Sequence, residues 1–286
     1  MTGPESIPHP PFARAAIAGI GLLGGSLAAA IKARNLADCV VGIGRNVHRL
    51  KAAQDAGLID TFATEATAVA DAELIVLCTP VEHIVRELSE FATHCRPGAL
   101  ITDVGSVKRS IVAAGDRLSP GIHFIGAHPL AGSEKQGFEH ADASLFERRL
   151  CVLTPSANTP EAAVNQVRAF WSAVGMKTRI MSPEGHDEAL AVTSHLPHLT
   201  AAVLAGSLPA EYRDLTGTGF RDTTRIAAGD PELWVQILLS NDDFLAASLD
   251  RIRQHLQEFQ SAVQRRDANA LRVLLQQAKA NRDALE

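Results

Sequence analysis

The sequence lacks the features that define several broad classes of protein. Its 286 residues include only four cysteines, which lie far apart and form no C-x-x-C or other metal-binding spacing: Cys39, Cys78, Cys95 and Cys151. We therefore expect reduced, mostly buried thiols and a cytoplasmic protein. No run reaches about 18 uninterrupted apolar residues, so we expect no membrane span. The proline-rich residues 1–13 lack the apolar core of a signal peptide and are expected to form a loose leader.

An excess of positive charge is also missing. The net charge is −5 and the isoelectric point is near 6.1, whereas nucleic acid binding would need a basic face. The eleven histidines include no H-E-x-x-H pair, and His195 and His198 have no third ligand nearby, so no metal site is expected. A G-x-S-x-G nucleophile motif is absent as well. A small-molecule substrate is the class of partner that these absences leave open.

The first half of the chain alternates short β-branched runs with amphipathic stretches, the pattern of parallel strands joined by helices. From about residue 183 these runs give way to long helical patterns. The predicted fold is therefore α/β, a Rossmann-type doubly wound parallel sheet over residues 14–182 followed by an all-helical domain over residues 183–286. We predict the first four strands at residues 15–20, 39–44, 73–80 and 98–106, helices at 24–35 and 48–57, and further strands at 122–127, 149–155 and 177–181.

A glycine-rich segment follows the first predicted strand. Gly19, Gly21 and Gly24 form G-x-G-x-x-G at the mouth of a predicted helix, and this context makes the motif specific for a dinucleotide. The first glycine permits a tight turn, the second lets the pyrophosphate approach the backbone, and the third allows close helix packing. The helix N-terminus offers free N–H groups to the phosphates. The residues predicted to contact the nucleotide are Gly19, Gly21, Leu22, Leu23, Gly24, Gly25, Ser26, Gly44, Arg45, Thr79, Pro80 and Asp103.

The end of the second predicted strand bears on the type of nucleotide. NAD enzymes usually carry an acidic residue there for the adenosine ribose hydroxyls, but this chain has Gly44 followed by Arg45. The missing carboxylate removes repulsion toward a 2′-phosphate, which a guanidinium can bind by charge-assisted hydrogen bonds. The sequence therefore favours NADP over NAD. Arg45 as a solvated loop residue that stacks on adenine is the alternative.

Four further motifs carry residues that are typical of an active site. They are DVGSVK at 103–108, GAHPLAGSEKQG at 126–137, SHLPH at 194–198 and GFRDTTRIAAGDPELW at 219–234. With the glycine segment in front of them, they resemble in content and order the prephenate/arogenate (cyclohexadienyl) dehydrogenase family of tyrosine biosynthesis, over roughly residues 14–280. The resemblance implies NAD(P)-dependent oxidative decarboxylation of prephenate or arogenate to 4-hydroxyphenylpyruvate or tyrosine. A hydride leaves the ring carbinol carbon, carbon dioxide is lost and the ring becomes aromatic.

The resemblance assigns the proton transfer of this reaction to His128. A neutral imidazole accepts a hydroxyl proton well near neutral pH, because its ordinary pKa is about 6.5. Pro129 biases His128 toward extended backbone geometry and so limits the movement of the ring. The resemblance also implies that the Ser106 hydroxyl binds His128 or the substrate hydroxyl. A helix N-cap for residues 107–115 is the alternative role of Ser106.

Substrate contacts are expected from the helical domain. Ser194 and His198 are four residues apart and would share one helix face, with His195 pointing elsewhere. The resemblance implies that His198 meets the substrate side chain and that Arg225 binds the ring carboxylate, for which a planar guanidinium is suited. The remaining predicted substrate contacts are Thr218, in the sequence TGTG, and Arg221. For Arg221 and Asp222 a surface or interdomain ion pair is the alternative.

Two other functions are compatible with parts of the sequence. A two-domain dehydrogenase of the β-hydroxyacid or imine-reductase type also joins such a sheet to helices, but it commonly uses a lysine of the helical domain, where this chain has only Lys279. A non-catalytic dinucleotide sensor would be expected to have lost its proton-transfer residues. The helices of residues 186–208 and 233–283 have long apolar faces, and the family pairs such domains, so we expect a homodimer. Because the sequence stops at Glu286, we expect no fused mutase or regulatory domain.

Overall fold

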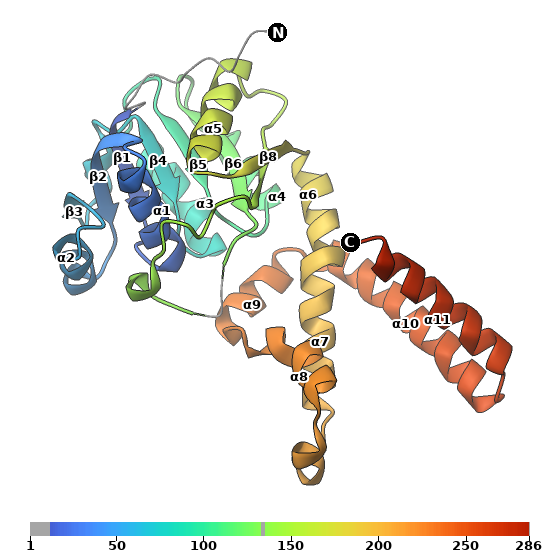
Figure 1. Ribbon diagram of the computed structural model, residues 1–286. Coiled ribbons are helices and arrows are strands. Elements are labelled where there is room, and N and C mark those ends of the chain that lie inside the picture. The colour runs from blue at the N-terminus through green and yellow to red at the C-terminus, as the bar shows by residue number, and fades with distance from the viewer. Residues whose placement is uncertain (1–11, 133–134, 286) are drawn as a thin grey trace, which may run out of the picture.

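The computed structural model describes residues 12–132 and 135–285, which form a sheet-containing part and a helical part (Figure 1). The predicted leader, residues 1–13, lies outside these described residues except for Phe12 and Ala13. Both belong to the first strand, and the Phe12 ring packs edge-on against the Phe170 ring with 6.0 Å between centroids. The ordered sheet therefore begins before residue 14, because Phe12 is held in the core.

A sheet of eight strands organises the first part of the chain. The strands are β1 Phe12–Ala18, β2 Ala37–Ile43, β3 Thr61–Ala63, β4 Leu74–Leu77, β5 Leu100–Asp103, β6 His123–Pro129, β7 Leu150–Thr154 and β8 Lys177–Ile180. Their order is β3-β2-β1-β4-β5-β6-β7-β8, so the chain reverses its direction of travel across the sheet between β1 and β4. Doubly wound sheets bind ligands outside the carboxyl ends of the strands at this point.

Helices cover both faces of the sheet, because its central strands are apolar on both sides. β4 and β5, with the sequences LIVL and LITD, are buried throughout, as expected of parallel strands enclosed between layers. Leu27 and Trp171 lie in the core on one face, whereas Ile84 and Ile111 lie in the core on the other. The helices of this part are α1 Leu22–Ala33, α2 Val47–Asp55, α3 Val81–Ala92, α4 Arg109–Gly115 and α5 Glu161–Ala173.

The sheet differs from the prediction in two respects. β3 was missed, since three residues carry too little alternation to be recognised; residues 98–106 therefore supply the fifth strand instead of the fourth. β7 runs antiparallel to β6, which makes the sheet mixed where the sequence predicted parallel strands throughout. The described connection between these two strands contains only a short 3₁₀ turn, Phe138–His140, in place of the crossover helix that a parallel pair needs.

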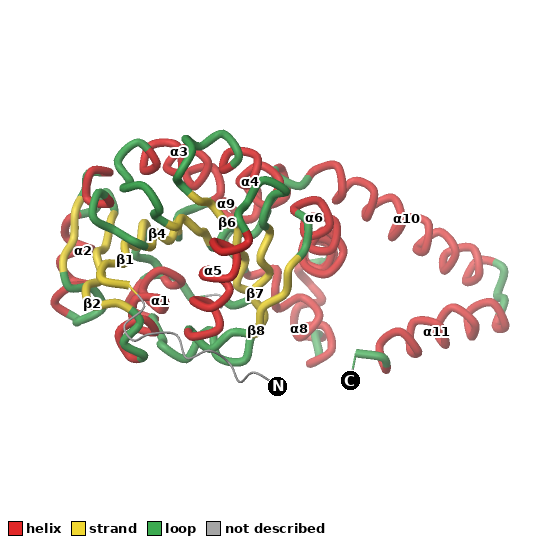
Figure 2. Tube along the Cα trace, turned by 90° about the horizontal axis from the view of Figure 1, so that it is seen from above, coloured by secondary structure: helices red, strands yellow, loops and turns green. Residues whose placement is uncertain are grey.

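The second part of the chain is helical (Figures 1 and 2). Its helices are α6 Pro183–Leu190, α7 Leu196–Gly206, α8 Thr218–Thr224, α9 Pro231–Leu239, α10 Asp242–Gln264 and α11 Ala268–Asp283. A π-helical turn, Ala191–His195, joins α6 to α7 in one continuous helix. α10 and α11 form a hairpin that projects away from the sheet (Figure 2).

Many apolar side chains of the helical part are exposed in the single chain. Val203 on α7 is 67% exposed and Leu239 on α9 is 71% exposed. Others lie on the α10–α11 hairpin and on the neighbouring helices: Leu215, Leu233, Val235, Leu256, Val263, Val273 and Leu275. So many large apolar side chains left exposed are typical of an interaction surface. The described helices therefore present apolar surface that the chain does not cover by itself.

The continuous helix Pro183–Gly206 is long and apolar enough, by length and composition, to cross a membrane, and 28% of its most apolar window is buried. The sequence analysis predicted this segment as a helix over residues 186–208, and polar residues interrupt its apolar run. The core helix of a soluble protein meets the same criterion. Three polar side chains of this helix, His186, Asp187 and His195, are buried inside the protein and bonded to other segments.

Candidate active site

A cleft with a volume of about 520 Å³ lies at the carboxyl ends of β1, β2 and β4. This is the edge of the sheet, beside the reversal in strand order, where a doubly wound fold binds a dinucleotide. Several residues that the sequence assigned to the nucleotide line the cleft: Gly19, Gly21, Gly44, Arg45, Thr79 and Pro80.

The glycines of the motif have the geometry that nucleotide binding requires. Gly19 has a φ of +90°, and a side chain there would approach the backbone of Cys78 to 2.9 Å. A Cβ at Gly24 would lie 2.0 Å from the Gly19 oxygen, so no other residue fits. Gly21 has no atom within 4 Å of the place of a Cβ, which leaves this side of the α1 N-terminus open for phosphates. The residues present therefore fit a dinucleotide.

Three of the residues predicted to contact the nucleotide also contact other parts of the chain. Gly25 faces Phe138, whose Cβ would lie 3.1 Å from an added side chain. The Ser26 hydroxyl is fully buried and accepts a hydrogen bond from the N–H of Asp142 at 3.0 Å. Asp103 is also fully buried, with both oxygens occupied by groups of the protein. These contacts hold the loops beside the glycine segment in place.

Two guanidinium groups line the cleft at the end of β2. Arg45 follows Gly44 directly, and Arg49 lies one turn into α2, whose N-cap Asn46 accepts a hydrogen bond from the Arg49 N–H at 3.1 Å. Arg45 and Arg49 are both exposed. Gly44 has room beside it, since its Cβ would contact only Leu50, at 3.6 Å.

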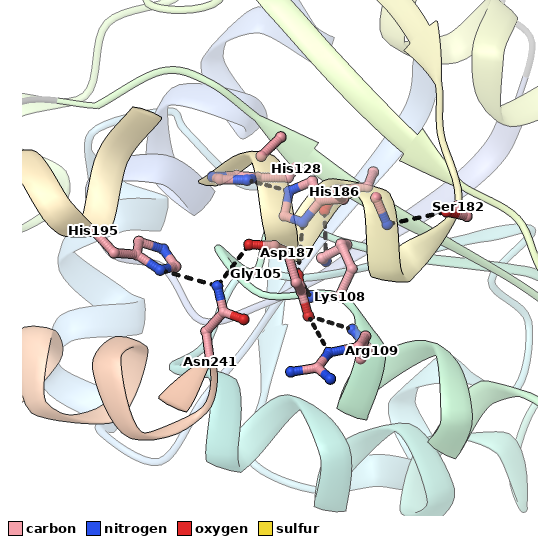
Figure 3. Close-up of polar contacts among 12 residues, drawn as sticks. Gly105, Lys108, Arg109, His128, Ser182, His186, Asp187, His195 and Asn241 are labelled. Atoms are coloured by element: carbon pink, nitrogen blue, oxygen red, sulfur yellow. Dashed lines mark hydrogen bonds and ion pairs between the residues drawn. The ribbon is translucent and has the colours of Figure 1, made fainter. Parts of the chain in front are cut away.

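His128 lies near the carboxyl end of β6, opposite Val152 of β7. The predicted strand ended at residue 127, but β6 continues through His128, whose backbone is extended, as the following proline favours. Its ring is partly exposed, and its Nδ1 lies 2.9 Å from Nε2 of His186 on α6 (Figure 3). Nδ1 of His186 in turn lies 2.7 Å from Oδ1 of Asp187. A chain of three polar side chains thus runs from the sheet into the first helix of the helical domain.

The surroundings keep His128 neutral. Burial first, and then the charges of His186, Lys108 and His195, hold the pKa of His128 well below its usual 6.5. A neutral imidazole can act as a proton acceptor near neutral pH. Among the described residues, Nε2 of His128 has no hydrogen-bond partner, so this nitrogen is available to a substrate.

Asp187 holds the start of α4 in place. Its Oδ1 accepts a hydrogen bond from the Lys108 N–H at 2.7 Å and its Oδ2 accepts one from the Arg109 N–H at 3.0 Å. Burial opposes ionisation of Asp187, but hydrogen bonds from His186, Arg109 and Lys108 keep its pKa below 3.8. A carboxylate from another domain therefore satisfies the first N–H groups of this helix.

Ser106 does not cap α4, because the helix begins at Arg109 with Lys108 at its N-cap position. The alternative role considered for Ser106 was therefore wrong. The Ser106 side chain is partly exposed and makes no hydrogen bond with the part of the chain that the structure describes, His128 included. Its hydroxyl is free to meet a ligand.

A buried ion pair lies beneath His128. Lys108 and Asp103 are both fully buried and bonded to each other, and the Lys108 ammonium also donates to the Ala127 carbonyl at 2.9 Å. Asp103 completes its bonding with the N–H of Ala127 at 2.9 Å and that of Gly105 at 2.8 Å. Burial lowers the pKa of Lys108, and Asp103 opposes this shift. The pair fixes the backbone of the residue just before His128 to the DVGSVK loop.

His195 lies within the site, although the sequence predicted that it would point elsewhere. It is buried, and its Nδ1 is 3.1 Å from Nδ2 of Asn241, which also donates to the Asp187 carbonyl at 2.7 Å (Figure 3). Burial is the main cause that lowers the pKa of His195 to about 4. The π-helical turn explains the error, because its wider winding shifts the face on which following residues lie.

His198 lies against Trp234, with the two rings stacked at 3.5 Å and 12°. It is buried, its Nδ1 lacks a partner among the described residues, and burial lowers its pKa. Ser194 is partly exposed. No group of three His, Cys, Asp or Glu side chains in the described ranges is arranged to hold a metal ion.

α8 and its C-terminal end carry three of the residues predicted to contact the substrate. Thr218, Arg221 and Arg225 are exposed, and their side chains make no hydrogen bond or ion pair with the residues that the structure describes. The surface or interdomain ion pair considered for Arg221 and Asp222 is therefore not formed with the described residues. The guanidinium of Arg225 remains available to an anionic group.

Comparison with known proteins follows the same division of the chain. Residues 27–180 match the family described as prephenate dehydrogenase, nucleotide-binding domain, and residues 182–277 match prephenate dehydrogenase, dimerization domain. The chain belongs to the prephenate dehydrogenase family. Its apolar helical surface is thus that of a dimerisation domain.

Three prephenate dehydrogenase relatives show how far the similarity extends. The prephenate dehydrogenase of Bacillus subtilis (strain 168) is 36% identical over 278 residues, covering 94% of this chain and 75% of that protein. The crystal structure of prephenate dehydrogenase from A. aeolicus in complex with hydroxyphenyl propionate and NAD+ is 30% identical, with a TM-score of 0.88 and coverage of 96% and 98%. Synechocystis arogenate dehydrogenase is 32% identical, with a TM-score of 0.83 and coverage of 96% and 100%.

Membership of the prephenate dehydrogenase family decides between the functions that the sequence left open. This protein is a prephenate/cyclohexadienyl dehydrogenase enzyme, and neither a dehydrogenase of the β-hydroxyacid or imine-reductase type nor a non-catalytic sensor.

Sequence reasoning missed His186 and Asp187 as residues of the site. Both stand in the segment GHDEAL, which was interpreted only as a helical pattern. The signal that could have found them is a histidine followed by an aspartate at the start of an otherwise apolar helix. Such polar groups are buried only when they are paired, so the two residues indicate a buried polar network.

Proposed function

We propose that His128 accepts the ring hydroxyl proton in the NAD(P)-dependent oxidative decarboxylation of prephenate, arogenate or both. The observation that carries the proposal is the orientation of this imidazole. Its Nδ1 is held by His186 and its Nε2 has no partner among the described residues, at the edge of the sheet where the nucleotide cleft opens. The products are 4-hydroxyphenylpyruvate and tyrosine, respectively. Steady-state rates with both substrates test the proposal.

NAD(P), when bound, supplies the hydride acceptor. Aromatisation of the ring provides most of the driving force, so the side chains of the protein need only orient the substrate and accept its hydroxyl proton. His128 takes the proton through Nε2, and the hydroxyl of Ser106 orients the reacting oxygen. Ser106 suits this role because its side chain is partly exposed and makes no hydrogen bond within the described chain.

Arg225 is proposed to bind the ring carboxylate of the substrate, with Ser194, His198, Arg221 and Thr218 completing the substrate contacts. Arg225→Ala should chiefly raise the Michaelis constant, because a bidentate carboxylate contact contributes to binding before and during the reaction. The measurement is KM and kcat in parallel, with Arg213→Ala as a control, since Arg213 is another exposed arginine of the helical domain. An unchanged KM for Arg225→Ala would exclude the contact.

NADP is proposed as the preferred cofactor, supported by the two arginines and the missing acid at the end of β2. Arg45→Ala should lower kcat/KM for NADP by about 10- to 100-fold with little effect on NAD, because a charge-assisted hydrogen bond to the 2′-phosphate contributes about 1.5–3 kcal/mol.

Gly44→Asp should shift the cofactor preference from NADP toward NAD, since the cleft has room for the carboxylate. Steady-state kinetics with both cofactors provide the measurement. A wild-type enzyme that prefers NAD would contradict the proposal.

We also propose that the protein is a homodimer, that its domains divide near residue 182 and that it is cytoplasmic. The exposed apolar side chains of α7, α9 and the α10–α11 hairpin support the dimer. The last strand ends at Ile180 and the first helix of the second part begins at Pro183. All four cysteines are free thiols, consistent with a reducing compartment. Light scattering at the mass of one chain would contradict the dimer.

A further inference from the structure

We propose that His186 and Asp187 form a proton relay behind His128, in which the proton taken from the substrate is held on His186 beside the Asp187 carboxylate and then returned. This inference rests on the proposed function of His128 and extends it to two residues of the helical domain. Neither residue would touch the substrate, so both act as positioning residues.

The geometry is that of a continuous hydrogen-bonded chain. His128 Nδ1 and His186 Nε2 are 2.9 Å apart, and His186 Nδ1 and Asp187 Oδ1 are 2.7 Å apart (Figure 3). His186 is fully buried, and Asp187 is 1% exposed. The outer end of the chain, the His128 ring, is partly exposed. A substrate can therefore reach the His128 end of the relay, whereas the His186 and Asp187 end is shielded from solvent.

The carboxylate fixes the direction of every hydrogen bond in the chain. Ionised Asp187 can only accept, so Nδ1 of His186 carries a hydrogen and donates to it. Neutral His186 then has a lone pair on Nε2, which accepts from the Nδ1–H of His128. This arrangement leaves the lone pair of His128 on Nε2, the nitrogen available to a substrate. Asp187 thus selects the tautomer of His128 that can act as a base.

The proton balance of the reaction calls for temporary storage. As the substrate O–H bond breaks, its electron pair forms the ring C=O bond and the carbinol hydrogen leaves as hydride to NAD(P). The hydroxyl proton goes to Nε2 of His128, and the Nδ1 proton of His128 moves to Nε2 of His186. His186 is then a cation beside the Asp187 anion. Loss of carbon dioxide breaks the ring-to-carboxyl bond, and its electron pair makes the ring aromatic and leaves negative charge on the same oxygen. The relay then runs backward and returns one proton to that oxygen, so none is released.

Asp187 is suited to stabilise a protonated His186 and not to accept its proton. Its oxygens accept from the N–H groups of Lys108 and Arg109 at 2.7 and 3.0 Å in addition to His186. Arg109 is itself held by Asp243 of α10 at 2.7 Å. With these donors the carboxylate stays ionised, so the proton has no path beyond His186.

Other charged or titratable groups surround the relay and contribute to its pH dependence. They are Lys108 and its partner Asp103 beneath β6, Arg109 at the start of α4, and His195 on the π-helical turn. The substitutions below leave all of these groups in place, so a change in the pH profile reports on His186 and Asp187.

Asp187→Asn tests the charge. Its amide oxygen would stay in the place of Oδ1, which accepts from both the Lys108 N–H and the Nδ1–H of His186, so the tautomer is kept and only the anion is lost. We expect kcat to fall by about tenfold or more, because the protonated His186 loses its counter-charge, with KM and nucleotide affinity nearly unchanged. The acid limb of the kcat/KM profile should also move to lower pH, because the anion that stabilises the protonated pair is gone. Glu188→Gln, an exposed neighbour on α6, is the matched control.

His186→Gln and His186→Leu test the transfer itself, and they decide the matter if Asp187→Asn does not fold. Glutamine keeps an acceptor for the Nδ1–H of His128 but cannot take a proton, whereas leucine removes both functions. We expect kcat to fall by about 10-fold in His186→Gln and by about 10²-fold or more in His186→Leu. Wild-type kcat in His186→Gln would overturn the relay, as would parallel losses of kcat and nucleotide affinity in both variants.

The wild-type enzyme in the same assay separates the relay from the proposed function. If the wild type turns over neither prephenate nor arogenate, the proposed function fails. If it turns over either one and the His186 and Asp187 variants keep its rate and pH profile, the relay alone fails.

Discussion

Replacement of His128 by asparagine is expected to lower kcat by about 10²–10⁴-fold, the usual contribution of a general base. The asparagine amide can still donate to His186 from the place of Nδ1, so the local structure should persist while the base is lost. Nucleotide affinity, measured by fluorescence titration, should stay nearly unchanged. His255→Asn, on the exposed face of α10, serves as the control and should behave as the wild type.

The pH dependence of kcat/KM gives this prediction a second, independent readout. The pKa of His128 lies well below 6.5, first because of burial and then because of His186, Lys108 and His195. Since the base acts in its neutral form, activity should be constant through neutral pH and fall only well below pH 6.5. A loss of nucleotide affinity that parallels the loss of kcat in His128→Asn would instead assign a structural role to His128.

Replacement of Lys108 by methionine is expected to destabilise the protein by about 3–5 kcal/mol, because it leaves the fully buried Asp103 carboxylate without its counter-charge. Calorimetry should show a fall of the melting temperature on the order of 10 °C. Activity should fall as well, since Lys108 also holds the Ala127 carbonyl next to His128.

The double variant Asp103→Asn with Lys108→Met provides the control for this effect. It removes both charges, so it should recover a large part of the stability that Lys108→Met loses. If the losses in the free energy of unfolding measured for the two single variants simply add up in the double variant, the two residues do not act as a pair.

The nucleotide site was largely predictable from the sequence, because its key constraints are local. Gly19 and Gly24 are required by a turn and by a close approach within six residues of chain. The extended backbone at His128 follows in the same way from the adjacent proline. The family motifs added the proposed role of His128 as the base, which no spacing could have supplied.

The parts that escaped prediction depend on contacts between distant segments. Asp187 caps a helix that begins almost eighty residues earlier, and only the packing of the two domains reveals this. The π-helical turn likewise has no sequence pattern of its own, so the inward direction of His195 could not be read from a period of 3.6 residues.

The measurement that tests the account most directly is the steady-state rate of reduced nicotinamide formation by the wild-type enzyme and His128→Asn, with prephenate and arogenate as substrates and carbon dioxide measured alongside. The account predicts that the wild type forms reduced cofactor and carbon dioxide in equal amounts with at least one substrate, and that His128→Asn binds the nucleotide but loses this rate. Full activity of His128→Asn, or no turnover of either substrate by the wild type, would contradict it.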